Sequence, residues 1–240
     1  MKHTLTWVSI FAIAMGFFEA AVVIYLRSIM YPAGFAFPLA PIAQGLAVTE
    51  ILREAATLIM LLSVGIIAGR NISERFAWFI YSFAIWDIFY YVFLRLLIGW
   101  PPSLMTWDIL FLIPVTWVGP VITPVIVSLS MLLLAGVIIF YSAKGIRVVI
   151  KGAEWSGLIA GSLILILAFI WDYSSFILSR YTLREIFNLP NNKPLYDLAM
   201  TYIPSSFNWF LFSTGQVVIL ITILLMARRL NRIIKMPTAG

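Results

Sequence analysis

The sequence predicts an all-α protein, a polytopic membrane helix bundle with six transmembrane helices and one re-entrant or interfacial half-helix. Three observations predict this class. Apolar residues make up 62% of the 240 residues, charged residues make up only 11%, and the mean hydropathy is +1.02. So few charges cannot cover the surface of a soluble domain of this size, and no long hydrophilic stretch is present. We therefore expect residues 1–240 to form a single integral membrane domain.

A transmembrane helix needs about 20 apolar residues to cross a hydrocarbon core of roughly 30 Å. Six stretches meet this requirement, approximately residues 5–26, 46–69, 76–97, 121–141, 155–178 and 207–226. Between the third and the fourth, residues 100–120 contain an apolar run at 109–113 that is too short to span and has prolines on both sides. We interpret this segment as a half-helix at about 103–118.

The basic residues predict the orientation of these spans, because Lys and Arg accumulate in cytoplasmic loops. If the N-terminus is cytoplasmic, ten of the 16 Lys and Arg residues lie on the inner side and four in outer loops, while Arg53 and Arg95 lie within helices. A seventh span at 100–120 would move the basic cluster at 144–151 to the outside. We therefore predict six spans, two cytoplasmic termini and a multi-pass protein of a cell membrane, with the prokaryotic cytoplasmic (inner) membrane as its location.

The composition also excludes several kinds of chemistry. The chain has no Cys and a single His, which excludes disulfides, thiolate metal sites, thiol nucleophiles, bis-imidazole haem ligation and His-rich metal sites. We therefore expect no cofactor, and the sequence assigns neither a catalytic residue nor a metal ligand. The net charge of +6 follows the sidedness of the loops, so nucleic acid is not an expected partner. The expected partners are the lipid bilayer and other membrane subunits.

The strongest functional signal comes from charges inside the predicted helices, because a charged side chain at membrane depth costs at least about 2.5 kcal/mol unless it is paired or hydrated. With a rise of 1.5 Å per residue, Glu19 lies roughly 21 Å along the first helix, and the other intramembrane charges also fall in the outer half. Glu50, Arg53 and Glu54 are spaced to share one helix face. We predict one polar pocket in the outer half of the bilayer, formed by Glu19, Glu50, Arg53, Glu54, Asp87, Tyr91, Arg95, Asp108 and Asp172.

This pocket has a structural and a functional interpretation. Arg53 and Arg95 can neutralise two carboxylates in buried pairs that fix helix register. Six acids against two arginines leave a surplus, however, so some acids must be protonated, hydrated or bound to a cation. We favour a non-catalytic membrane subunit or a binding or assembly protein. The alternatives are a proton- or cation-coupled transporter and an intramembrane enzyme in which a carboxylate such as Glu54 or Asp87 is the base.

Overall fold

The computed structural model describes residues 2–113, 115–182 and 193–235. Within these residues, six helices are long and apolar enough to cross a membrane, which confirms the predicted number of spans. They are α1 (Lys2–Met30), α2 (Gln44–Ala68), α3 (Ile72–Ile98), α4 (Ile122–Ala143), α5 (Gly152–Leu178) and α8 (Trp209–Lys235). The short helix α7 (Lys193–Ala199) precedes α8. The chain is therefore an integral, multi-pass membrane protein.

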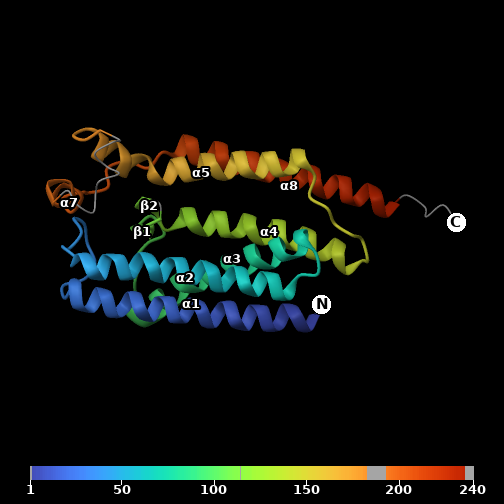
Figure 1. Cartoon of the computed structure of the whole chain (residues 1–240), viewed down its shortest axis with the longest axis horizontal. Coiled ribbons are helices and arrows are strands. Elements are labelled where there is room, and N and C mark those ends of the chain that lie inside the picture. Colours follow the sequence, from blue (N-terminus) through green and yellow to red (C-terminus); the bar gives the residue numbers. More distant parts are fainter. Residues whose placement is uncertain (1, 114, 183–192, 236–240) are drawn as a thin grey trace.

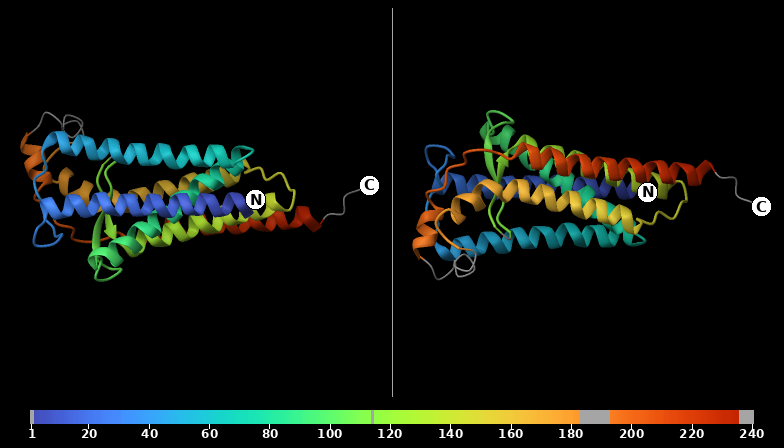
Figure 2. Two further views of the ribbon diagram at one scale, coloured as in Figure 1. Left: turned by 90° about the horizontal axis from the view of Figure 1, so that it is seen from below. Right: turned by 90° about the horizontal axis from the view of Figure 1, so that it is seen from above.

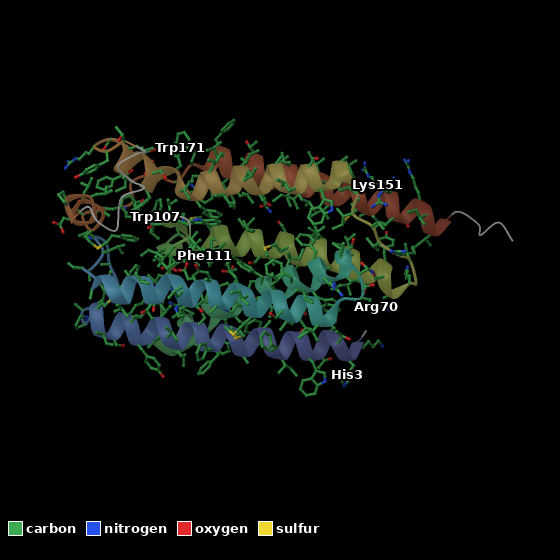
Figure 3. The ribbon with its side chains drawn as sticks, viewed as in Figure 1. His3, Arg70, Trp107, Phe111, Lys151 and Trp171 are labelled. Carbon is green, nitrogen blue, oxygen red and sulfur yellow. The ribbon has the colours of Figure 1, made fainter. Side chains whose placement is uncertain are left out.

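The six long helices run side by side, and the start of α1 and the end of α8 lie at the same end of the bundle (Figure 1). We call this the terminal end and the opposite one the hairpin end. Helix α3 is central, because α1, α2 and α4 all pack against it. Helices α5 and α8 pack against each other, and they contact the rest of the bundle where α8 packs on α4 and α5 packs on β2. Arg70 and Lys151 lie at the terminal end, whereas Trp107 and Phe111 lie nearer the hairpin end (Figure 3).

The segment between α3 and α4 differs from the prediction. Instead of a half-helix at 103–118, strands β1 (Trp107–Phe111) and β2 (Trp117–Pro120) form an antiparallel hairpin, with Asp108 opposite Gly119. Figure 2 shows the two strands running across the helix axes. The half-helix prediction is wrong because aromatic and branched side chains suit strands, and because the flanking prolines cannot donate helical hydrogen bonds. The pairing also satisfies backbone groups that would be costly to leave unpaired inside a membrane.

Local signals in the sequence set the two ends of α3. At its start, the side chain of Asn71 accepts a hydrogen bond from the backbone N–H of Glu74 at 3.1 Å, which is a typical N-cap. At its end, Gly99 adopts a left-handed conformation with φ of 69°, which favours glycine over any other residue. The central helix of the bundle therefore has defined limits.

Two glycines bring the outer helices close to α3. A Cβ atom on Gly16 of α1 would lie 2.9 Å from the carbonyl oxygen of Trp86, and one on Gly65 of α2 would lie 2.7 Å from that of Arg75. Both distances are shorter than a van der Waals contact, so only glycine permits this approach. The contacts bring both helices to the backbone of α3.

A cavity lined by carboxylates

A cavity of about 70 Å³ lies among α1, α2, α3 and β1, which is enough space for a few water molecules. Five of the nine predicted pocket residues line it, namely Glu19, Arg53, Glu54, Asp87 and Tyr91. The rest of the wall consists of Val23, Thr57, Trp86, Tyr90, Ile109, Leu110 and Phe111. The structure therefore brings acids from three different helices to one space, and β1 forms part of its wall.

Among the residues that the structure describes, Arg53 is the only basic side chain in the cavity wall, and it already has two acidic partners. Its Nε donates to Glu50 on the same helix at 2.8 Å, and its Nη1 donates to Glu19 on α1. Glu50 lies behind the arginine and does not line the cavity. Because one guanidinium is shared by two carboxylates, Arg53 supplies no positive charge beyond what these partners need.

The other two cavity acids form no ion pair among the described residues. Glu54 accepts a hydrogen bond from the backbone N–H of Leu112 at 2.9 Å, and Asp87 accepts one from the hydroxyl of Ser128 at 2.8 Å. Both donors are neutral, and Glu54 is only 9% exposed. The cavity thus carries two carboxyl groups that have no ion-pair partner in the described chain, because Arg53 in the same wall is paired with Glu19 and Glu50.

A fifth predicted acid, Asp108 of β1, does not line the cavity. It is 1% exposed, pairs with Arg27 of α1 at 3.0 Å and accepts a hydrogen bond from the hydroxyl of Tyr91 at 3.3 Å. The guanidinium of Arg27 also stacks on Trp100 and Phe35, at 3.8 and 4.3 Å from the ring centroids. This pair attaches the hairpin to α1 and needs no further counter-charge.

Arg95 and Asp172 are not brought to the cavity. Arg95 donates to the carbonyl oxygens of Gly99 and Pro101 at 2.6 and 3.0 Å, and so stabilises the end of α3. Asp172 accepts hydrogen bonds from the hydroxyl of Tyr202 at 2.7 Å and from backbone and side chain of Ser205 at 3.0 and 2.7 Å. It anchors the segment that leads into α8. The functions of both residues are local.

Sequence reasoning missed several residues around the site. Thr57 and Trp86 line the cavity but are uncharged, so intramembrane charge did not identify them. Tyr90, which lies next to the predicted Tyr91, lines it too. Helical spacing identifies them in retrospect, because each lies one turn from, or next to, a predicted acid. Arg27 is one of the four basic residues that the sequence places in outer loops, because the predicted first span ends at residue 26. In the structure α1 continues to Met30, so Arg27 lies within this helix.

The arrangement suits the binding of positive charge. Within the described parts of the chain, no group of three or more His, Cys, Asp or Glu side chains is placed to hold a metal ion. Two carboxylates without ion-pair partners, in a small and partly open cavity, can instead hold a proton or a small cation. The chain matches no known family model, no curated protein and no solved structure, so this geometry carries the functional argument.

Proposed function

We propose that the protein is a non-catalytic membrane binding protein or subunit that holds a small, positively charged ligand in the cavity among α1, α2, α3 and β1. One observation carries the proposal: Glu54 and Asp87 face the same cavity without ion pairs, while Arg53 is already used by Glu19 and Glu50. An ionised carboxylate in a low-dielectric interior costs several kcal/mol unless it is compensated. A proton or a small cation supplies that compensation.

The packing below the cavity favours binding over the transport alternative. Toward the terminal end, Gly16 and Gly65 bring α1 and α2 to backbone contact with α3. The buried side chains of the three helices in this part of the bundle include Ala12 of α1, Leu61 of α2 and Ala77 of α3. A conducting path needs polar steps across the whole bilayer. These three residues provide none, although Ser9 and Tyr81 hydrogen-bond between α1 and α3 at 2.7 Å. The close backbone contacts and these apolar residues support a pocket over a continuous path.

Thermal unfolding of the detergent-purified protein tests the proposal. We expect the melting temperature to depend on added small cations at constant ionic strength, or on pH, because a ligand that binds only the folded state stabilises it. The double variant Glu54→Gln/Asp87→Asn removes both charges with little change in shape and should lose this dependence. Asp197→Asn is the matched control, because Asp197 is an exposed acid on α7, away from the cavity. Equal responses of the wild type and the double variant would overturn the proposal.

A further inference from the structure

We infer that the ligand of the cavity is a small organic ammonium with an oxygen acceptor close to its nitrogen, the chemistry of an amino alcohol. This inference rests on the proposed function and specifies its ligand. The same chemistry is offered by a free amino alcohol and by the headgroup of an aminophospholipid. Three features of the cavity wall carry the inference: its carboxyl groups, its aromatic rings and one indole N–H.

The carboxyl groups of Glu54 and Asp87 come from α2 and α3 and meet at one cavity. An ammonium group has several N–H donors, so it can form charge-assisted hydrogen bonds to two carboxylates at once. Divalent cations are less well suited. Calcium takes about six to eight oxygen ligands, and no cluster of three acidic or imidazole side chains is found among the residues that the structure describes.

Aromatic side chains supply a second feature that favours an organic cation. Trp86, Tyr90 and Tyr91 all line the cavity beside Asp87. Aromatic rings attract ammonium groups through the negative potential of their faces, and Trp is the most effective of them. A strongly hydrated alkali cation gains less from such a wall than an ammonium group that has apolar substituents.

The indole of Trp86 supplies the third feature. Trp86 is 7% exposed, it belongs to the cavity wall, and its Nε1–H has no hydrogen-bond partner among the described residues. A buried donor without an acceptor is destabilising, and a ligand oxygen that reached this edge of the indole would satisfy it. A bare ammonium ion has no acceptor and cannot do this. A cavity of about 70 Å³ also limits the bound group to a few non-hydrogen atoms.

The test compares chloride salts of ethanolamine, ammonium, sodium and tetramethylammonium at equal ionic strength, on the full chain in detergent. Ethanolamine should raise the melting temperature most, by roughly 5–10 °C at a hundredfold excess over its Kd. Ammonium should have a smaller effect, because it lacks the oxygen. Tetramethylammonium, which lacks N–H donors, and sodium should have little effect.

Two variants locate the effect. Glu54→Gln/Asp87→Asn should abolish the response to ethanolamine, and Trp86→Phe should reduce the ethanolamine response to that of ammonium, with Asp197→Asn unchanged. The comparison of the four salts on the wild-type protein tests the inference without any variant. The test therefore remains valid even if one of the variants does not fold. Equal stabilisation by sodium and ethanolamine would overturn this inference and leave the proposed function standing. No stabilisation by any cation or by pH would overturn both.

Lipid nanodiscs distinguish the two sources of the ligand. If the headgroup of an aminophospholipid is bound, nanodiscs of phosphatidylethanolamine should stabilise the protein relative to phosphatidylcholine, and added ethanolamine should have little further effect. If a free amino alcohol is bound, ethanolamine should stabilise the protein equally in both lipids. Either result supports the shared chemistry, whereas no response to ethanolamine or to phosphatidylethanolamine contradicts it.

Discussion

Arg53 pairs with two carboxylates on two helices, Glu19 and Glu50, whereas the cavity acids Glu54 and Asp87 have no ion-pair partner in the described chain. Removing one member of a buried ion pair leaves an uncompensated charge, which costs roughly 3–5 kcal/mol. Arg53→Gln should therefore destabilise the protein by about this amount in detergent, measured by thermal or chemical unfolding. Glu54→Gln should cost less than about 1 kcal/mol, because the amide oxygen can still accept from the backbone N–H of Leu112. If Glu54→Gln proves as damaging as Arg53→Gln, Glu54 is an ionised member of a structural pair.

Depth along a helix was enough to predict part of the site. Counting residues from the membrane edge placed Glu19, Glu54 and Asp87 in the outer half of the bilayer, and these acids do line one cavity. Depth alone does not say which way a side chain points. Arg95 and Asp172 were predicted at a similar level, yet they turn to the end of α3 and to the segment before α8. The direction in which a side chain points depends on how the helices pack, and the hydropathy of a single sequence does not determine that packing.

Close packing of the helices depends on single glycines. Gly16 and Gly136 allow a comparison between a glycine in a close contact and one in open space. A Cβ on Gly16 would meet the carbonyl oxygen of Trp86 at 2.9 Å, whereas a Cβ on Gly136 of α4 would meet nothing within 4 Å. Gly16→Ala should therefore separate α1 from α3 and destabilise the protein by about 1–3 kcal/mol. Gly136→Ala should be neutral or stabilising by up to about 1 kcal/mol, because Ala favours helix. Thermal unfolding of both variants checks this, and a tolerated Gly16→Ala would contradict the described contact.

Hydropathy predicted the long helices well, because crossing a membrane imposes a length and a composition on each. The hairpin was harder to predict. Residues 109–113 are apolar but too few to show a helical or alternating period, and the pairing of β1 with β2 is a tertiary contact. The prolines indicated that no long helix forms there, but they did not indicate which irregular structure replaces it. A membrane-spanning helix, which is recognised by its length and composition, is therefore easier to predict than a strand that forms only by pairing with another strand.

At the scale of the whole molecule, we predict that the terminal end faces the cytoplasm and the hairpin end faces outward. The chain has no Cys, so single cysteines can be introduced without removing others. Ser103 precedes the hairpin, Ala143 ends α4, and both are exposed. Ser103→Cys and Ala143→Cys should be labelled from opposite sides of the membrane by an impermeant reagent, Ser103→Cys from the outside. Labelling of both from one side would contradict the six-span arrangement, and the reverse pattern would invert its orientation.

We propose that the bundle keeps two carboxyl groups around a small space because a positively charged ligand occupies it. An experimental density map of the protein, purified with its native lipids and resolved well enough to show side chains, tests this most directly. We expect density that belongs to no protein atom, within hydrogen-bonding distance of both Glu54 and Asp87. A map in which the space is closed, or in which both side chains pair with basic residues or point into lipid, would contradict it.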